Sequence, residues 1–573
     1  MGISGLFDIG KTALLTTRKA LDTVGNNIAN ASTPGYSRQE VVLENIPSGI
    51  FSSTGLSGRG VRISDVQRMY SSYVSLQMRN ESSLLSYYET YNRLITQIED
   101  IFNESSDYGI SPSISSFFNA WDEVAQYPDG YAQRAQLLQQ AETLTVRISQ
   151  AANTLVGQRS EILKSTKDLI DKTNTYLNQL YDLNEKIAAS PGALDLKDQR
   201  DYTLEQLGKI LNITSYEDNS GRYAVLIGGT PLLDGGIVYK MKAELTGAGS
   251  IRVSVDLPTG DVDITNTITN GELKANLQMR DSIIPDYLTK LNAMAINIAD
   301  QVNYYHRQGI GLDSSTGNNF FNDLYSVTDN SASGEITSLT ISSSVAYGQN
   351  PGKIYQIDYD MVGGADYQQE AASGIYWRVR ESSDDGATWS AIPTASVAIS
   401  VDTAASPESR TLIFNGIKVR IDADQTDLIS DAAGSFDSLS LSRNASSEMQ
   451  VALTDPNKIA AAMNAALLPG DNTNAKILAD LFNQTFMEGS TITAFYTAIV
   501  STVGASSSAA AGNLKFQTAL VKELETRRQE LSGVSLDEEA AKLLIYQRSY
   551  EAAAKMITVA DELFQTILAM TGR

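Results

Sequence analysis

The stretch GLFDIGKT, residues 5–12, carries residue types that could bind phosphate. It matches the pattern G-x-x-x-x-G-K-[ST] of a P-loop, in which backbone amides and a lysine hold the phosphates of a nucleotide. A working P-loop needs a buried strand that leads into the glycine loop, and only four residues precede Gly5. Apolar residues within and after the stretch recur at helical spacing. The sequence therefore predicts a helix here and no nucleotide site.

A second match, SSDDGATW at 382–389, fits the Asp-box of sialidases and other β proteins. In that motif Asp384 and Gly386 would close a β-hairpin, and Trp389 would pack beneath it. Sialidases carry several boxes and an arginine cluster, whereas this sequence has one box and no such cluster. The match predicts a structural hairpin, and a glycan-binding or adhesive role of the surrounding β region stays open as an alternative.

Other catalytic and metal-binding chemistry is scarce. The chain has no cysteine and a single histidine, His306, which excludes thiol nucleophiles, disulfides and Cys/His zinc sites. Neither G-x-S-x-G nor S-x-x-K occurs, and His306 at a helix end is expected to serve packing or capping. Asp422, Asp424 and Asp427 lack the central Gly and terminal Glu of an EF-hand, so a solvated edge is expected. The sequence predicts no enzyme activity, no catalytic residues, no cofactor and no metal.

Length and charge set further bounds. A chain of 573 residues is too long for one core, and three or four domains are expected. The net charge of −23 repels phosphate backbones, so no nucleic-acid partner is expected. No run approaches the length of a membrane span, and the first residues lack the features of a cleavable signal peptide.

Both ends of the chain read as helices with heptad spacing. Near the start, Phe7, Leu14, Leu21 and Ile28 fall seven apart, and Ala13, Ala20 and Val24 flank the same stripe. Near the other end, Ser535 and Glu538 form an S-x-x-E capping box, and Gly533 is expected to end the helix before it. The apolar positions that follow recur at steps of three and four residues, and they are Leu536, Ala540, Leu543, Tyr550, Ala553, Ile557, Ala560, Leu563 and Ile567.

Helical and strand-like patterns alternate along the rest of the chain. This order predicts a multidomain α+β protein, with long terminal and core helices in coiled-coil-like bundles and inserted all-β outer domains. Helices are expected around 84–102, 131–189, 196–211, 284–305, 456–468, 474–486, 491–503 and 513–531. Residues 1–70 form an inner helix and a turn-and-strand segment, which pairs with 511–573. A helical body, 71–211, continues in 271–320 and 446–510. The β insertions are 212–270, a small one, and 325–445, an outer domain in which Ile375, Trp377 and Val379 alternate with polar residues.

The most informative stretch is ALDTVGNNIANASTPGYSRQEVV, residues 20–42. A helix ends in an asparagine-rich segment, and Thr33-Pro34-Gly35-Tyr36 suits a type II turn with Gly35 at positive φ. A strand-like segment follows. Asn26, Asn27 and Asn30 are expected to pair with polar backbone in the turn or in an adjacent subunit.

This stretch closely resembles the N-terminal motif of bacterial flagellar axial proteins, which include rod, hook and hook-associated proteins. The longer form with GYSRQ resembles the family of the first hook-associated protein, which joins hook and filament. Segments 58–79, 271–321 and 532–568 resemble the same family in the same order, over perhaps 350 residues in all. The β regions carry no such resemblance.

The resemblance implies a structural, non-enzymatic part of the extracellular flagellum that functions in motility and flagellum assembly, secreted by the flagellar type III apparatus. It implies a ring of identical subunits between hook and filament, built through the terminal helices. The implied partners are further copies of the chain, the hook protein, the next junction protein toward the filament, an export chaperone and the export apparatus. Rod or hook proteins are the nearest alternatives within the superfamily.

Coupled folding and assembly is the expected mechanism, because isolated helices with a narrow apolar stripe are marginal in water. Both ends are expected to stay mobile in the monomer and to order when neighbouring subunits cover them.

Overall fold

The computed structural model describes residues 3–46, 60–103 and 109–571, with short breaks at 219, 248, 328–331, 333, 349–352, 365, 371–373, 384–386, 406 and 432. Contacts group the chain into two compact units. The first comprises Met1–Asn92, Lys164–Leu277 and Ala511–Arg573, and the second comprises Arg93–Leu163 and Gln278–Ala510. This grouping cuts across the expected helical body, 71–211, because α2 and α4 both run from one unit into the other.

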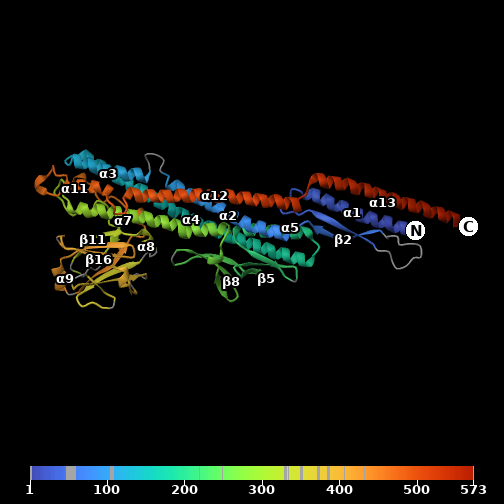
Figure 1. Cartoon of the computed structure of the whole chain (residues 1–573), viewed down its shortest axis with the longest axis horizontal. Helices are drawn as coiled ribbons and strands as arrows, with labels where there is room; N and C mark the ends of the chain where they lie inside the picture. The colour runs from blue at the N-terminus through green and yellow to red at the C-terminus, as the bar shows by residue number, and fades with distance from the viewer. Residues whose placement is uncertain are drawn as a thin grey trace. The chain divides into compact units, whose positions relative to one another are not determined.

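Long helices make up most of the chain (Figure 1). The α-helices are α1 (Ile3–Asn30), α2 (Ser72–Ile101), α3 (Ile110–Gln126), α4 (Tyr131–Ala189), α5 (Leu194–Ile210), α6 (Gly271–Gln278), α7 (Ile284–Gln308), α8 (Ser344–Gly348), α9 (Gln425–Asp431), α10 (Ala445–Glu448), α11 (Thr473–Asp480), α12 (Ile492–Ser532) and α13 (Leu536–Thr571). The segment Met279–Ile283 is a π-helical turn between α6 and α7. The architecture is multidomain α+β, as predicted.

Several helix predictions are confirmed and others are wrong. The expected helix 131–189 is α4, and 284–305 lies within α7. The segments 491–503 and 513–531 belong to one continuous helix, α12, in which the four alanines between them favour helix and no Pro interrupts it. The expected helix 456–468 is wrong: only the 3-10 turns Pro456–Lys458 and Ala465–Leu467 form there. Helix α3 was not predicted at all.

The small β region of the first unit contains two antiparallel sheets that pack against α4. One has the order β3 (Thr214–Glu217), β4 (Tyr223–Ile227), β5 (Thr230–Asp234), β6 (Ile237–Val238), and the other β7 (Met241–Leu245), β8 (Ile251–Leu257), β9 (Gly260–Asp263). Asparagine side chains of α4 hold both sheets. Asn184 bonds the backbone N–H and C=O of Tyr223, and Asn174 bonds those of Met241, at 2.9–3.1 Å.

The outer β region of the second unit also contains two sheets. Their strands are β10 (Tyr325–Ser326), β11 (Glu335–Ile341), β12 (Ile354–Asp360), β13 (Gln368–Gln369), β14 (Tyr376–Ser382), β15 (Ser390–Ala391), β16 (Ala398–Asp402), β17 (Ser409–Phe414), β18 (Ile417–Asp422) and β19 (Ala433–Leu441). One sheet has the order β10-β19-β12-β14-β13, with β15 beside β14, and the other has the order β11-β18-β17-β16. The rings of Tyr355 and Phe414 meet between the sheets, with centroids 5.3 Å apart.

The predicted alternation in this region is confirmed. Ile375, Trp377 and Val379 are buried, and Arg378 and Arg380 of the same strand are half-buried on the other face. The Asp-box residues Asp384 and Gly386, with 385, lie outside the described residues. The indole of Trp377 donates to Glu370, which forms an ion pair with Arg410 in the interior.

The helical part of the second unit buries an aromatic cluster around His306. The rings of Trp121 and Phe320 lie against its ring, and Phe117 packs against both of them. His306 is fully buried, with Nδ1 2.6 Å from the carbonyl of Asn318 and Nε2 accepting from the amide of Ala460 at 3.0 Å. The expectation that His306 serves packing is confirmed.

No described helix is both long and apolar enough to cross a membrane. Among the described residues, no cluster of His, Asp or Glu has the arrangement of a metal site.

Candidate assembly interface

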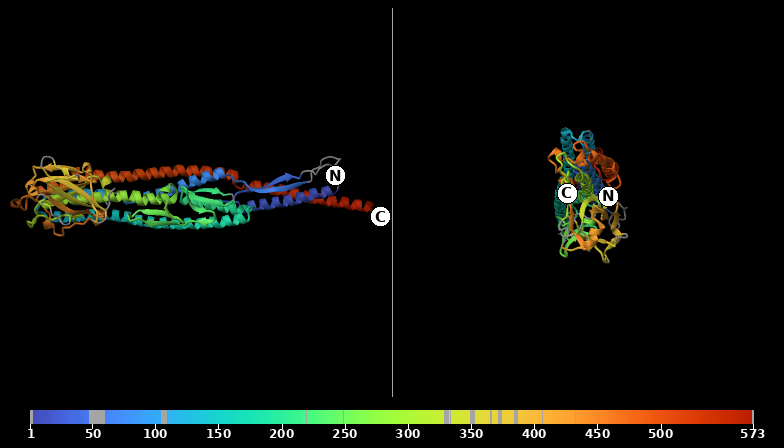
Figure 2. Two further views of the ribbon diagram at one scale, coloured as in Figure 1. Left: turned by 90° about the horizontal axis from the view of Figure 1, so that it is seen from below. Right: turned by 90° about the vertical axis from the view of Figure 1, so that its left-hand side faces the viewer.

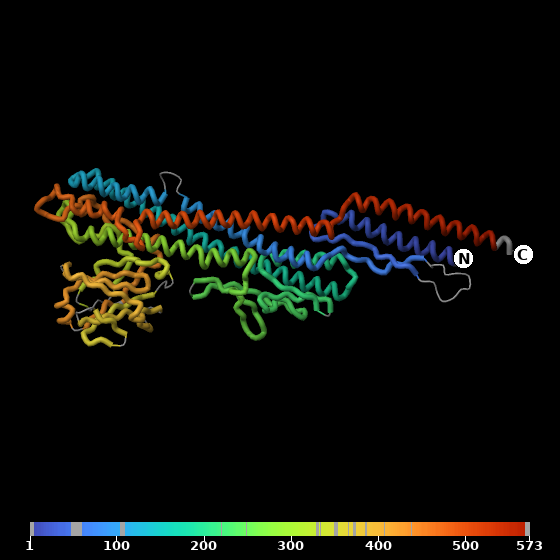
Figure 3. Tube along the Cα trace, viewed as in Figure 1, coloured from blue at the N-terminus to red at the C-terminus, as the bar shows by residue number. Residues whose placement is uncertain are grey.

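The first and last helices pack against each other along most of their length. Figures 1 and 2 show α1 and α13 side by side, and their described outer ends lie close together (Figure 3). The helices are antiparallel, since Gly10 meets Ile557 near one end and Asn27 meets Glu539 near the other. The terminal segments therefore form a two-helix layer within one chain.

Small residues bring the two helices together. A Cβ atom on Gly10 would lie 2.7 Å from Cγ1 of Ile557 and 3.6 Å from the backbone oxygen of Ala553. Gly10 is the second glycine of GLFDIGKT, and the whole stretch lies inside α1 with Lys11 exposed. No strand precedes it among the described residues, so the P-loop match is a helix-packing pattern.

The predicted α1 stripe lies beside the centre of this contact. Val24 is buried, with Ala20 and Gly10, whereas Phe7, Leu14, Leu21 and Ile28 are only half-buried. A stripe one residue further along the chain is rotated by about 100° on a helix. The four heptad residues thus line the edge of the pair.

On α13 the buried positions are Glu539, Ala553 and Ala560, with the half-buried Tyr546 completing a spacing of seven. We call these four residues the α1-facing row. Ala553 and Ala560 belong to the predicted apolar positions of this helix. The predicted interface residues fall beside the row: Leu543 and Ile557 are half-buried, whereas exposed fractions are 56% for Leu536, 40% for Tyr550, 45% for Leu563 and 47% for Ile567.

A second apolar row runs along α13. It consists of Ile545, Ala552, Met556, Val559 and Leu563, which follow one another at steps of seven, four, three and four, and which are exposed except for the half-buried Met556. Three of its side chains, Ile545, Val559 and Leu563, are 41–60% exposed. Such a heptad spacing is typical of a helix that packs against another helix.

Asn27 fastens the end of this helix pair. Its side chain accepts from the backbone N–H of Gln39 and donates to the carbonyl of the same residue, both at 2.9 Å. It also donates to the carboxylate of Glu539 at 2.9 Å and accepts from the hydroxyl of Tyr36 at 2.8 Å. One buried amide therefore links α1, the first strand and α13.

The predicted turn is confirmed. The amide of Tyr36 donates to the carbonyl of Thr33 at 3.2 Å, and Gly35 has a φ of +80°. A side chain at Gly35 would also meet Tyr202, at 2.8 Å from its Cβ. Pro34 is exposed before it, and the turn leads into the two-stranded sheet of β1 (Gln39–Asn45) and β2 (Val61–Arg68). The order of helix, turn and strand follows from the sequence.

Asn26 and Asn30 have smaller roles. Asn30 donates to the side chain of Asn26 at 2.9 Å and accepts from Thr33 at 3.2 Å, and Asn26 is 3.3 Å from the hydroxyl of Tyr36. These bonds are exposed to solvent, so they cost little when they are lost.

Ion pairs fix the turn and the strands to the helix α5. Arg68 of β2 lies 2.8 Å from Asp198 and 3.0 Å from Asp201, with all three side chains largely buried. Asp198 also accepts from the amide of Ser37. Burial raises the pKa of Asp198, and the opposing effect of Arg68 is smaller. Burial, with the charges of Asp198 and Glu539, raises the pKa of Tyr36 to about 12, so this phenol stays protonated.

The start of α13 is fixed in the same place. Ser535 caps it by accepting from the amide of Glu538 at 3.4 Å, and Gly533 follows the end of α12, both as predicted. This bond is the serine half of the predicted capping box, and the carboxylate of Glu538 pairs instead with Arg38. Arg38 donates its amide to the carbonyl of Ser532 and pairs with Glu538 at 3.2 Å. The N-terminal turn and the α12–α13 connection thus form one joint.

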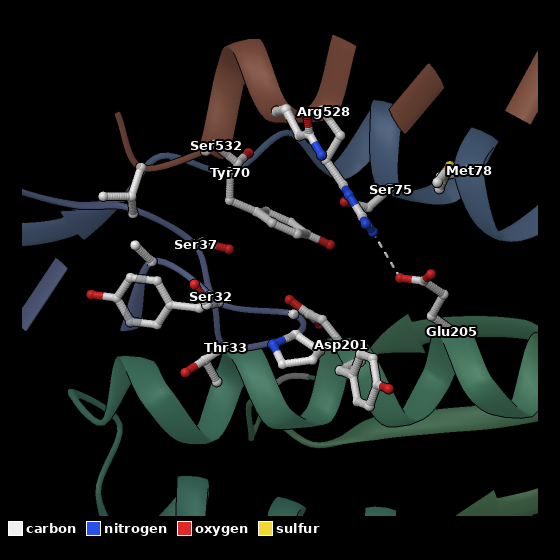
Figure 4. A pocket seen from close by; sticks show the side chains of 18 of the residues that line it. Ser32, Thr33, Ser37, Tyr70, Ser75, Met78, Asp201, Glu205, Arg528 and Ser532 are labelled. Carbon is white, nitrogen blue, oxygen red and sulfur yellow. Dashed lines mark hydrogen bonds and ion pairs between the residues drawn. The ribbon is translucent and has the colours of Figure 1, made fainter. Parts of the chain in front are cut away.

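A cavity of about 250 Å³ lies in this joint (Figure 4). The turn, the start of α2, α5 and the end of α12 line it. Arg528 reaches across to Glu205 at 2.8 Å, and Asp201 and Tyr70 contribute polar atoms. The walls hold no activated nucleophile or His, so the joint has the chemistry of a packing contact between segments.

Sequence reasoning did not identify two groups here. Glu539 resembled an ordinary acidic residue in the first turn of a helix, and its burial depends on Asn27, 512 positions away in the chain. The Arg68 cluster joins residues 130 or more positions apart. Neither has a local pattern that would reveal it.

Comparisons with known proteins agree with this geometry. Residues 95–321 match the family model of the flagellar hook-associated protein FlgK helical domain. Residues 7–36 match that of the flagella basal body rod protein, and 526–570 that of the flagellar basal body rod FlgEFG protein C-terminal. The latter two matches cover α1 with its turn and most of α13.

Full-length relatives carry the same description. Flagellar hook-associated protein 1 of Salmonella typhimurium is 27% identical over 99% of this chain and 100% of the relative, and that of Bacillus subtilis is 22% identical over 98% and 97%. The structure of the flagellar hook junction protein FlgK from Burkholderia pseudomallei has a TM-score of 0.58 at 17% identity, covering 80% of this chain and all of that one. The chain belongs to the flagellar hook-associated protein 1 family and is a structural protein of the bacterial flagellar axis, not an enzyme.

Proposed function

We propose that this chain forms the junction between the flagellar hook and the filament, and that it polymerises through its terminal helices. The observation that carries the proposal is the apolar surface of α13. Eight large apolar side chains of this helix are at least 40% exposed in the single chain: Leu536, Leu544, Ile545, Tyr550, Val559, Leu563, Phe564 and Ile567. Apolar surface on this scale marks a contact with other molecules.

Neighbouring subunits are the occupants we propose for this surface. The second apolar row has the spacing of a coiled-coil seam, so a helix of another subunit fits it better than a sheet or a small ligand would. The helix pair is then kept at a fixed angle to the rest of the first unit by the turn and its asparagines, which are Asn26, Asn27, Asn30, Pro34, Gly35 and Tyr36. The half-buried heptad residues at the edge of the pair, Phe7, Leu14, Leu21 and Ile28, complete the contact with the neighbouring subunit.

Folding of the ends is coupled to assembly in this proposal. The α1-facing row contains two alanines, a glutamate and a half-buried tyrosine, so few large apolar side chains are fully buried between α1 and α13. A helix pair that gains so little free energy from its own packing becomes fully ordered only when neighbouring subunits cover the second apolar row of α13. The helix pair would therefore be the least stable part of the free monomer.

Several partners follow from this role. We propose a ring of identical subunits that contacts the hook protein on one side and the next junction protein toward the filament on the other. A flagellar chaperone would keep the ends soluble, and the flagellar type III apparatus would export the chain to the outside of the cell. The absence of cysteine suits a chain that is threaded through a channel.

Electron microscopy of a deletion strain tests the function. Finished hooks without filaments, with filament protein released into the medium, are the expected result, and a plasmid copy of the gene should restore attachment. Normal filaments on the deletion strain would refute the junction role, and missing hooks would point to a rod or hook role instead.

A further inference from the structure

The edge of the outer β region is bound by side chains of a helix. Strand β11 is an edge strand of its sheet and pairs with β18 on one side only. On its other side α7 supplies the hydrogen bonds, and Figure 1 shows α7 running beside it. Asn297 bonds the N–H and C=O of Ile341, Asp300 accepts from the amide of Leu339 at 2.9 Å, and Arg307 donates to the carbonyl of Thr337 at 2.7 Å.

Asp300 differs from the other members of this contact because it is an acid without a close cation. It is 4% exposed, and among the described residues no Lys or Arg nitrogen lies within 4.0 Å of its carboxylate. Arg307 is the cation whose charge acts on Asp300, but its guanidinium donates hydrogen bonds to Asn319 and to the carbonyl of Thr337. The charge of Asp300 also acts on the phenol of Tyr325, which is largely buried and whose pKa is raised. Burial raises the pKa of Asp300 to about 6.

Ser338 allows this acid to exist in both protonation states. Its hydroxyl donates to Oδ2 of Asp300 at 2.7 Å when the carboxylate is charged. A hydroxyl is also an acceptor, so after protonation the acid can donate to Ser338 while Oδ1 still accepts from Leu339. The side chain of Gln301 also donates to Oδ2 at 3.3 Å, and a protonated Oδ2 keeps a lone pair that can accept this bond.

We propose that Asp300 and Ser338 form a proton-binding latch between α7 and the outer β region, which holds β11 more tightly in mildly acidic medium. The inference is independent of the junction role. An Asp whose pKa is raised by folding contributes stability that is complete below its ordinary pKa and lost as the pH rises through the folded value. The contact between β11 and α7 is then weakest at neutral pH.

Hydrogen exchange of the full chain measures this effect at the amides of Leu339 and Ile341. For a pKa that rises from 3.8 to about 6, the ratio of the wild-type opening constant of β11 to that of the variant Asp300→Asn should fall about tenfold between pH 7.5 and pH 5, after correction for intrinsic exchange. His306 titrates on the same helix with the opposite effect, but it is present in both chains and cancels in the comparison.

Two outcomes would overturn the latch. One is a ratio of the two opening constants that does not change between these pH values, and the other is a ratio that rises toward pH 5. If the variant does not fold, carbon-13 NMR of aspartate carboxyls in the wild-type chain decides. One buried carboxyl should titrate near pH 6, and the absence of any such titration contradicts the proposal.

Discussion

Acid should loosen the helical core of the second unit through His306. The neutral ring donates from Nδ1 to the carbonyl of Asn318 and accepts at Nε2 from the amide of Ala460. A proton on Nε2 would face an N–H group, and the charge would be buried among aromatic rings. Burial accordingly lowers the pKa of His306 to about 4, and the cations Arg134 and Arg307 add to this effect.

The magnitude follows from the difference between the two states. A base whose pKa is lowered by folding is neutral in both states above pH 6.5, so its stability contribution is complete there and is lost as the pH falls toward 4. With about 1.4 kcal/mol per pH unit, the loss is about 2 kcal/mol at pH 5 and about 3 kcal/mol near pH 4.

Urea unfolding at pH 7.5 and pH 5, followed by tryptophan fluorescence, measures this loss. Trp121 reports on the region because its ring centroid lies 6.3 Å from that of His306. The variant His306→Gln will be less stable at both pH values, since one buried hydrogen bond is missing, but it should lack the histidine's share of the pH dependence. Other titrating groups, including Asp300, are common to both chains. An equal change in unfolding free energy in the two chains would refute the reasoning.

Further predictions concern the terminal helix pair. Gly10→Ala should impair filament attachment because the added methyl collides with Ile557, at about 1–3 kcal/mol, whereas Gly25→Ala in the same helix meets nothing within 4 Å and should be neutral or stabilising; equal effects on attachment would contradict the close packing. Asn27→Leu should abolish attachment, since it leaves several buried polar groups without a partner at a cost of about 1–3 kcal/mol each, while Asn26→Leu should have little effect; normal filament growth with Asn27→Leu would contradict the structural role of Asn27. Mild trypsin treatment of the monomer should remove both ends and leave a core near 70–510, as gel electrophoresis and mass spectrometry would show; full protection of both ends would count against coupled folding. Lys11→Ala should leave function intact, and loss of attachment with a folded chain would revive the nucleotide reading.

Features written in neighbouring residues were predictable from the sequence. The turn at Gly35, the cap at Ser535 and the alternation around Trp377 each depend on a pattern of a few positions. The length of α4 also follows from an uninterrupted helical pattern without Pro or repeated Gly. Such signals do not depend on what the segment packs against.

Contacts between distant segments were not predictable, and asparagine shows why. Asn27, Asn174, Asn184, Asn297 and Asn303 lie within helices, and each pairs with the backbone of a distant residue. In sequence, Asn is read as a turn or cap residue because its side chain competes with the helix backbone. Its partner is a backbone group that any residue type supplies, so no sequence pattern marks it.

The heptad stripe of α1 illustrates a related limit. Large residues dominate a periodicity analysis, so Phe7, Leu14 and Leu21 defined the predicted stripe. The structure centres the contact with α13 on Gly10 and on Ala20, which only flanked the predicted stripe, because small residues allow two helices to approach closely. The sequence therefore identified the correct helix, but the predicted face is rotated about the helix axis from the centre of the contact with α13.

The most direct test of the central claim introduces a charge into the second apolar row of α13. Val559→Lys places an ammonium group in the surface that neighbours should cover, and Thr558→Lys places it on an adjacent exposed position outside that row. Both variants are expressed in the deletion strain, and export and filament attachment are scored by immunoblotting and electron microscopy. The account predicts that both chains are exported, that Thr558→Lys restores filaments and that Val559→Lys leaves bare hooks. Filaments of normal number and length with Val559→Lys would contradict it.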